Sequence, residues 1–353
     1  MNKFVNVFQL VDNWVLVQNL CTGLYVDSMV KDTCRVRTMK LFLQILVVFL
    51  VACVVFAGAA VFSTWAPDRT AQDLSARWAV PPSKFMPVFG MEVHFRDEGP
   101  RDDPLPIVLL HGTSASLHTW DGWVQELKVN RRVISFDLPA FGLTGPDPHN
   151  DYSIAAYVRF VTAVLDKLGV QSCVQAGNSL GGQIAWATTV AVPQRVQQLV
   201  LVDSAGYPFQ SQSIPVGFRM ARTPGLRVIL EHVLPRSIVE SSVRNVYGDP
   251  TKVTSALVDR YYELALRAGN RQALAHRFDQ GLSADASTIK NVKIPTLILW
   301  GAKDRLIPLE NGQRFASDIA DSKLVVFDSL GHVPHEEDAK ATVDVVKTFL
   351  GKP

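Results

Sequence analysis

The sequence predicts an α/β fold, a mainly parallel, doubly wound sheet with a helical cap insertion, behind an N-terminal membrane segment. Three observations lead to this prediction. Short apolar runs, typical of strands buried on both faces, alternate with amphipathic helical stretches. A strand-free helical stretch interrupts the alternation between residues 207 and 285. An uncharged run of 22 residues precedes both.

The uncharged run, residues 41–62 (LFLQILVVFLVACVVFAGAAVF), predicts a transmembrane segment or signal anchor, since 22 residues at 1.5 Å each span about 30 Å. Its N-terminal flank is the more basic one, with Lys31, Arg35, Arg37 and Lys40 against Arg69 and Arg77 on the other side. Because basic flanks stay in the cytoplasm, we expect a single N-terminal pass. The globular domain then lies on the non-cytoplasmic side, periplasmic or extracellular, with the lipid bilayer as a partner.

The processing of this segment stays open at the level of sequence. Its length favours a retained anchor, whereas 57–59 (AGA) suits a signal peptidase and Cys53 suits lipidation. Residues 1–40 follow no periodic pattern. That fits a disordered N-terminal segment, or a start at Met39 rather than Met1 with the preceding residues an annotation artefact.

The α/β core is predicted over 84–206 and 286–353. Residues 90–99 alternate as a half-exposed strand before a Pro/Asp-rich turn. Continuous apolar runs predict buried strands at 106–112, 131–137, 172–178, 197–203, 295–301 and 323–328. Helical patterns lie between them, for example at 153–169 and 338–351, so helices should cover both faces of the sheet.

The segment 207–285 predicts a helical cap. Its stretches 216–234 and 255–269 are amphipathic and are broken by Pro and Gly. Open α/β folds bind ligands at the carboxyl ends of their strands, so the cap should cover a pocket there. We expect apolar cap residues such as Phe218 to line it.

Composition excludes several functions. The net charge of +2, with no basic run interleaved with aromatics, argues against a nucleic-acid partner. Three of the four cysteines precede residue 54, which leaves Cys173 without a disulfide partner in the globular part. No CxxC pair or His/Cys cluster with ligand spacing occurs, so we expect no metal and no cofactor. No pattern indicates the oligomeric state.

A nucleophile is predicted in the stretch QAGNSLGG, 175–182. It places Ser179 at a sharp corner between a strand and a helix, with Gly177 and Gly181 leaving room for their close approach. The hydroxyl would stand clear of the sheet edge, near the positive end of the helix. A glycine-rich turn with a capping serine is the simpler alternative, so the rest of the chain must decide.

A serine needs a base, and that base needs an orienting acid. His332 lies in a loop directly after the last predicted strand, which suits a base above the sheet edge. His335 is its competitor, but its position suits a solvated first helical turn. Asp304, just past strand 295–301, is the predicted acid, and Asp203 is the alternative.

An oxyanion needs two donors. Leu180 N–H, directly after the serine, supplies one, and Thr113 N–H in the small-residue loop after strand 106–112 supplies the other. His111 is interpreted as a residue that shapes this loop. Asp137, at the end of another strand, is expected to hold its own loop.

With these residues in place, the chain resembles the α/β-hydrolase fold family. His111-Gly112, GNSLGG at 177–182, the Asp304 loop and Gly331-His332 follow the family's order over about residues 84–352. The resemblance implies the nucleophile elbow, the acid and the histidine of a serine esterase or lipase. Two departures stand out: Ala140 replaces a frequent glycine without an obvious effect, and the oxyanion loop reads HGTSAS. It lacks both the HGxGPG run of relatives that cleave carbon–carbon bonds and the HGGG run of one esterase branch.

The predicted function is that of a carboxylesterase- or lipase-like serine hydrolase. It would cleave a small-molecule carboxylic ester with an apolar acyl or alcohol group through an acyl-enzyme. One alternative is carbon–carbon bond hydrolysis of ring-fission products, in which cap arginines such as Arg219 and Arg222 would bind a carboxylate. Another is a non-enzymatic ligand sensor that keeps the fold. The sequence does not specify the physiological substrate or its chain length.

Overall fold

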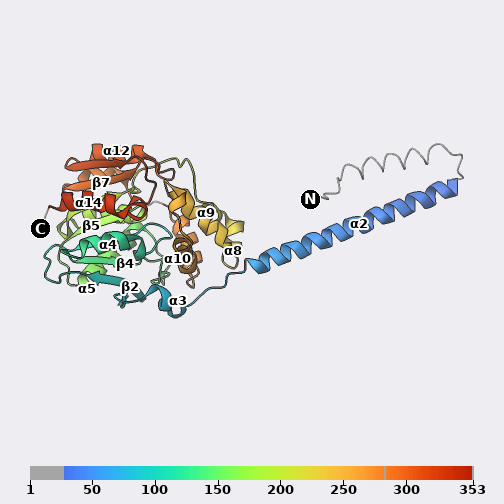
Figure 1. Ribbon diagram of the computed structural model, residues 1–353, viewed down its shortest axis with the longest axis horizontal. Helices are drawn as coiled ribbons and strands as arrows, with labels where there is room; N and C mark the ends of the chain where they lie inside the picture. The colour runs from blue at the N-terminus through green and yellow to red at the C-terminus, as the bar shows by residue number, and fades with distance from the viewer. Residues whose placement is uncertain (1–27, 282–283, 352–353) are drawn as a thin grey trace. The chain divides into compact units, whose positions relative to one another are not determined.

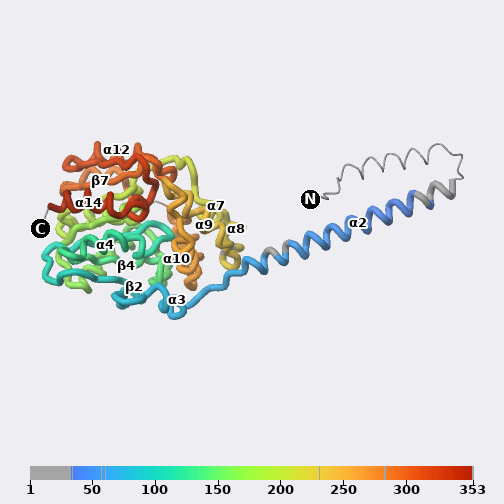
Figure 2. Tube along the Cα trace, in the orientation of Figure 1, coloured from blue at the N-terminus to red at the C-terminus, as the bar shows by residue number. Residues whose placement is uncertain are grey.

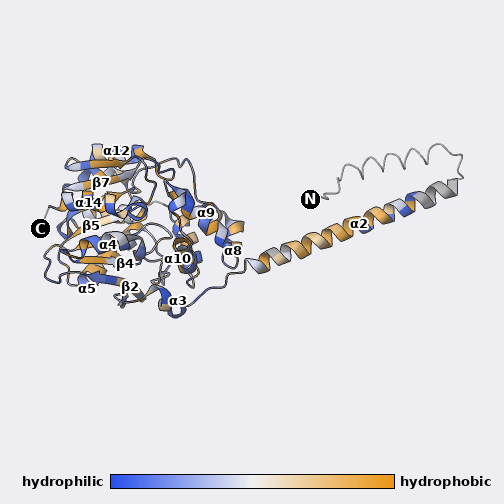
Figure 3. Cartoon of the chain, in the orientation of Figure 1, coloured by the Kyte–Doolittle hydropathy of each residue, from blue (hydrophilic) through white to orange (hydrophobic). Residues whose placement is uncertain are grey.

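The structure is a computed structural model that describes residues 28–281 and 284–351 (Figure 1). It divides into two compact units, Met1–Ser63 and Thr64–Pro353. In the first unit, helix α2 spans Ser28–Ser63, and its part Arg35–Ser63 is long and apolar enough to cross a membrane (Figure 3). Length and composition are the only basis for this, and a signal sequence can have the same length and composition. Residues 1–27 of the predicted N-terminal segment lie outside the described residues.

The second unit contains one sheet with the strand order β1-β2-β4-β3-β5-β6-β7-β8. The strands are β1 (Lys84–Val88), β2 (Met91–Glu98), β3 (Ile107–Leu110), β4 (Val133–Phe136), β5 (Cys173–Asn178), β6 (Val196–Val202), β7 (Thr296–Gly301) and β8 (Ser322–Phe327). Pairing is antiparallel from β1 to β4 by way of β2, and parallel through the rest of the sheet. The predicted α/β class with a mainly parallel sheet is therefore confirmed. Strand β1, which contains Pro87 and lies at the sheet edge, was not predicted.

Two layers of apolar side chains sandwich the sheet. Along β3, Val108 and Leu110 belong to one buried cluster, and Ile107 and Leu109 belong to the other, as the two-residue period of a strand requires. The first cluster includes side chains of α5 (Ile154–Lys167), α6 (Leu180–Ala191) and α12 (Leu309–Asp318). The second includes α4 (Asp121–Leu127) and α14 (Ala339–Leu350). Both faces are thus covered by helices.

Five helices lie between β6 and β7, in the segment predicted as the cap (Figure 2). They are α7 (Val216–Arg222), α8 (Pro224–Leu230), α9 (Arg236–Val246), α10 (Ser255–Ala265) and α11 (Asn270–Asp279). The remaining short elements are α3 (Ala71–Trp78), α13 (Pro334–Glu337) and the 3-10 turns η1 (Leu117–Trp120), η2 (Pro193–Arg195), η3 (Pro250–Lys252) and η4 (Ala286–Asn291).

The first residues of the second unit, 64–69, pair with two parts of the cap. Ala66 N–H donates to His232 O at 2.9 Å, and Arg69 N–H donates to Leu266 O at 2.7 Å. No apolar period marks this short segment, so its pairing was not predictable from the sequence. It joins the turn after α8 to the end of α10 and holds the cap helices together.

Candidate active site

Ser179 occupies a strained corner between β5 and α6. Its backbone has φ 55° and ψ −114°, in a region that L-residues rarely adopt. A Cβ at Gly177 would overlap Gly181 O, and one at Gly181 would overlap Leu110 O. Side chains at these two positions would therefore force the strand and the helix apart, and the predicted need for glycine has this physical cause.

Asn178, which the sequence analysis did not single out, ties this corner to the neighbouring loops. Its Nδ2 donates to Val202 O at 3.1 Å and to His332 O at 2.9 Å, and the side chain is buried. Ser179 N–H also donates to Val202 O at 3.1 Å. The side-chain amide of Asn178 thus links the serine corner to the histidine loop, although 154 residues separate Asn178 from His332 in the sequence.

His332 and Asp304 form a short buried contact. His332 Nδ1 donates to Asp304 Oδ2 at 2.6 Å, and the exposed fractions of the two side chains are 5% and 0%. The other carboxylate oxygen of Asp304 accepts from Leu306 N–H at 2.8 Å and from Ile307 N–H at 3.0 Å. These two backbone bonds fix the carboxylate, so its free oxygen can hold the imidazole in one orientation.

Asp203, the alternative acid, lies in the same cluster but has another partner. Its Oδ1 accepts from Gly301 N–H at 3.0 Å, and its side chain is fully buried. Burial raises the pKa of Asp203 well above its usual value, and the neighbouring Asp304 charge raises it further. Both effects disfavour the ionised form of Asp203, and the carboxyl group in hydrogen-bond contact with His332 is that of Asp304.

Asp203, Asp304 and His332 each place one potential metal-ligand atom within 4.8 Å of the other two. At this spacing the three atoms could surround a cation. From the sequence, these three residues were considered as base and candidate acids, not as metal ligands. The 2.6 Å separation of Nδ1 and Oδ2 is that of a hydrogen bond in which Nδ1 carries its proton. A protonated Nδ1 has no lone pair for a metal, so the arrangement fits a proton-transfer pair better than a metal site.

His335 does not occupy the solvated turn that the sequence analysis expected. It is fully buried, its ring centroid lies 4.0 Å from that of Trp120, and its Nε2 lies 3.1 Å from Thr119 Oγ1. Burial lowers the pKa of His335 well below its usual value. It packs beneath the loop as a neutral core residue, which leaves His332 as the histidine at the pocket.

Glu337, also missed from the sequence, anchors the histidine loop to the cap. Its carboxylate accepts from Gly331 N–H at 2.9 Å, Gly248 N–H at 2.9 Å and Asp249 N–H at 2.8 Å. The backbone of the loop makes a second link, since His332 N–H donates to Val246 O at 2.8 Å. Loop and cap therefore share one buried carboxylate. Only its place in a helical turn was visible in the sequence.

The two predicted oxyanion donors lie beside Ser179. Thr113 lines the same cavity as Ser179, and no protein acceptor for its N–H is found among the described residues. Leu180 is the first residue of α6, so its N–H belongs to the helix-terminal group that has no intrahelical acceptor. His111 shapes this loop as expected: its Nδ1 donates to Gly112 O at 2.8 Å, and its Nε2 accepts from Leu138 N–H at 2.9 Å.

The loop that follows β4 corrects one expectation. Ala140 has φ 81°, in the left-handed region that favours glycine, so the replacement of glycine by alanine here has a conformational cost of about 1 kcal/mol. Asp137 holds the loop as expected, because its carboxylate accepts from Leu117 N–H and Leu143 N–H, each at 2.7 Å.

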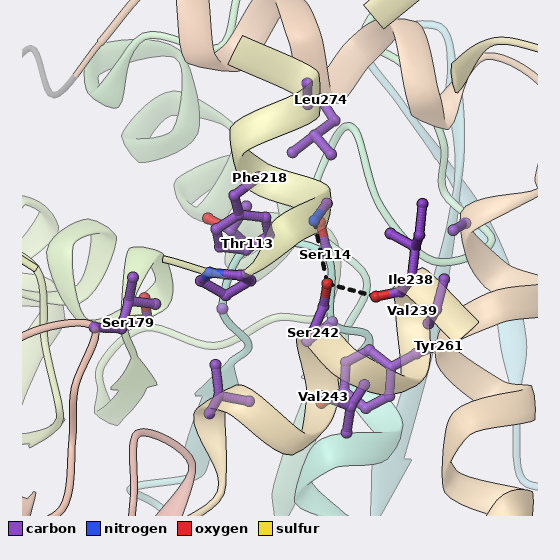
Figure 4. Close-up of a pocket in the computed structure, with 18 of the residues that line it drawn as sticks. Thr113, Ser114, Ser179, Phe218, Ile238, Val239, Ser242, Val243, Tyr261 and Leu274 are labelled. Carbon is purple, nitrogen blue, oxygen red and sulfur yellow. Dashed lines mark hydrogen bonds between the residues drawn. The ribbon is translucent and has the colours of Figure 1, made fainter. Parts of the chain in front are cut away.

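A cavity of about 150 Å³ opens onto Ser179, Thr113 and His332. Its far walls are largely apolar and come from the cap, with Phe218, Ile238, Val239, Val243 and Leu274 among them. In Figure 4, Ser179 and the cap residues Val239 and Tyr261 lie at opposite sides of this pocket. The expected role of Phe218 as a lining residue is confirmed. Arg219 and Arg222 are exposed and do not line the cavity.

The family model for the alpha/beta hydrolase fold matches residues 106–339, about two thirds of the chain. The chain belongs to this family. The match includes the serine corner, the loops that carry Asp304 and His332, and the cap. The resemblance inferred from the motifs is thereby confirmed at the level of the fold family and of a hydrolase.

The similar proteins include named hydrolases and a membrane phospholipase A, whose crystal structure superposes with a TM-score of 0.65 at 22% identity over 89% of this chain and 98% of that one. A 2-hydroxy-6-oxo-2,4-heptadienoate hydrolase of Pseudomonas putida is 30% identical over 74% of this chain and 93% of its own length. A 2-hydroxymuconate semialdehyde hydrolase of a Pseudomonas species is 28% identical over 74% of this chain and 92% of its own length. The crystal structure of a meta-cleavage product hydrolase from Pseudomonas fluorescens superposes with a TM-score of 0.66 at 24% identity, over 76% of this chain and 97% of that one.

The geometry predicts different roles for the two aspartates. Asp304→Asn removes the anion that orients the imidazole and should lower kcat roughly 10³- to 10⁴-fold. Asp203→Asn keeps the shape of the side chain and leaves the bond between His332 and Asp304 in place, so it should lower kcat less than about tenfold. Steady-state kinetics, with thermal unfolding to verify the fold, measures both. The reverse order of effects would make Asp203 the orienting acid.

Proposed function

We propose that the chain is a serine hydrolase in which Ser179 attacks a substrate carbonyl, His332 accepts the serine proton and Asp304 orients His332. Thr113 N–H and Leu180 N–H would stabilise the oxyanion. The observation that carries the proposal is the buried 2.6 Å bond between His332 and Asp304 on the wall of a cavity that also exposes Ser179. A sensor would not need a base anchored in this way.

Each half of the cycle passes one proton through His332, and the second half returns a proton to Ser179. Attack by Ser179 Oγ forms a carbon–oxygen bond, and the serine proton passes to His332 Nε2. Collapse of the oxyanion expels the leaving group, which takes that proton. Water, activated by the same nitrogen, then hydrolyses the acyl-enzyme and releases an acid. The bond that breaks depends on what the pocket holds.

Carbon–carbon bond cleavage of a ring-fission product is the candidate that the comparisons favour. The relatives named above are hydrolases of such compounds, and one reaches 30% identity over nearly its full length. Ester hydrolysis, which the sequence analysis predicted first, therefore becomes the second candidate. Neither reaction would use Arg219 or Arg222, because both residues are exposed and do not line the cavity.

Ester hydrolysis retains two specific supports. The cap walls of the cavity are largely apolar and suit an acyl or alkyl chain. The loop HGTSAS lacks the HGxGPG run of carbon–carbon hydrolases. One cap arginine, the partly buried Arg260, is paired with Glu336 and does not line the cavity, so it is not free to bind a carboxylate there.

A substrate panel tests the proposal and separates the two bonds. The full-length protein in detergent should hydrolyse either a ring-fission dienoate or p-nitrophenyl esters of graded chain length. Ser179→Ala should lower that activity roughly 10⁴-fold or more without loss of stability. A fluorophosphonate should label wild-type protein once, in the peptide containing Ser179. Activity that survives Ser179→Ala, or a label on another serine, would refute the proposed mechanism.

We further propose that α2 anchors the protein in a membrane, with the globular unit on the non-cytoplasmic side. The length, composition and basic N-terminal flank of α2 support this. In the globular unit, Trp65, Val228 and Ile229 have exposed fractions of 54%, 57% and 49%. Trp65 pairs with Val233, just after α8, the helix that carries Val228 and Ile229. Such a group suits a lipid–water interface.

The anchor has a direct test by fractionation. The full-length protein should stay in the membrane fraction after a high-salt wash and should be released by detergent. Protease added from the non-cytoplasmic side of intact cells should digest the globular unit. A soluble full-length protein, or a globular unit protected until the cells are lysed, would contradict the proposed location or orientation.

A further inference from the structure

Arg271 is a buried cation on the wall of the substrate cavity. It lies in the first turn of α11, lines the cavity together with Ser179 and Phe218, and has a side chain that is 8% exposed. It also lines a smaller cavity of about 40 Å³. The two cavities share Ser114 and Ala115, so the guanidinium lies where they adjoin.

Only one side of this guanidinium has a protein partner. Its Nη2 donates to Asp68 Oδ1 at 2.6 Å, in the segment that joins the cap helices. Its Nε and Nη1 are buried and have no hydrogen-bond partner among the described residues. Two donors of a fixed, planar fork are thus left free. Buried guanidinium donors without an acceptor are costly, so an acceptor is expected from outside the protein.

The other polar side chains that the cap contributes to the cavity wall already have partners. Ser242 Oγ donates to Ile238 O at 2.7 Å, and Tyr261 Oη donates to Glu336 Oε2 at 2.8 Å. Arg227 is paired with Asp279 at 2.7 Å and is 34% exposed. No aspartate or glutamate is among the described residues that line the cavity. The cavity therefore combines apolar walls with cationic groups and has no anion of its own.

We propose that Arg271 forms an anion-binding subsite of this cavity, and that the substrate carries a carboxylate or phosphate group remote from the carbonyl that Ser179 attacks. This deepens the proposed function and rests on it. Each of the two free groups, Nε and Nη1, can donate a charge-assisted hydrogen bond to an oxygen of such an anion, and Asp68 keeps the guanidinium in position. The adjoining 40 Å³ cavity gives room for a group of that size.

Three p-nitrophenyl esters of equal acyl length test the subsite: hexanoate, hydrogen adipate and 6-phosphonooxyhexanoate. Arg271→Gln should lower kcat/KM for a charged ester roughly tenfold or more, mainly through KM, and should leave hexanoate within about twofold. Arg271→Lys should restore part of the loss. The charged ester whose kcat/KM falls more in Arg271→Gln shows whether the subsite prefers a carboxylate or a phosphate.

Arg222→Gln is the matched control, because Arg222 is a cap cation stacked on Phe278 that does not line the cavity. Arg222→Gln should leave kcat/KM unchanged for both charged and uncharged esters. A loss on charged esters equal to that of Arg271→Gln would indicate a long-range charge effect. Equal losses on charged and uncharged esters in Arg271→Gln would indicate a structural role and overturn the subsite. An unchanged preference for charged esters in Arg271→Gln would also overturn the subsite.

Calorimetric binding of the same esters to Ser179→Ala separates the subsite from the proposed hydrolysis. If the charged esters bind through Arg271 but the wild-type protein hydrolyses none of the three, the subsite stands and the hydrolase proposal fails for this class of substrate. If hydrolysis proceeds but no binding depends on Arg271, the subsite fails and the hydrolase proposal stands.

Discussion

The short bond between His332 and Asp304 is the interaction on which the arrangement of the site depends. The two residues follow different strands, β8 and β7, and meet because parallel neighbours bring their carboxyl ends to one edge of the sheet. Asn178 holds the histidine loop from the serine side, and Glu337 holds it from the cap side. The imidazole therefore has a defined orientation toward the cavity without a bound substrate.

The sequence predicted the features that depend on local chemistry. The strained corner at Ser179 is readable because it needs small neighbours, and the buried parallel strands are readable as continuous apolar runs. Partners remote in sequence were not readable. Asn178, Glu337 and the segment 64–69 act through bonds to distant backbone groups, which leave no pattern in one chain. His335 was misplaced for this reason, since its burial depends on Trp120.

The family establishes a hydrolase fold, whereas the bond that is cleaved depends on the cap. The same corner and histidine can serve an ester or a ketone, because both chemistries begin with attack on a carbonyl. Specificity then comes from the apolar cap walls and the few cations among them. The paired Arg260 and the half-free Arg271 show how two cap arginines acquire different roles from their neighbours.

The central claim is that Asp304, not Asp203, holds the Nδ1 proton of His332. Proton NMR of the nitrogen-15-labelled protein tests it most directly, since a buried imidazole N–H in a short bond to a carboxylate resonates far downfield. A His332→Gln variant assigns the signal. The account predicts that the resonance persists in Asp203→Asn and disappears in Asp304→Asn. Loss in Asp203→Asn with persistence in Asp304→Asn would contradict it.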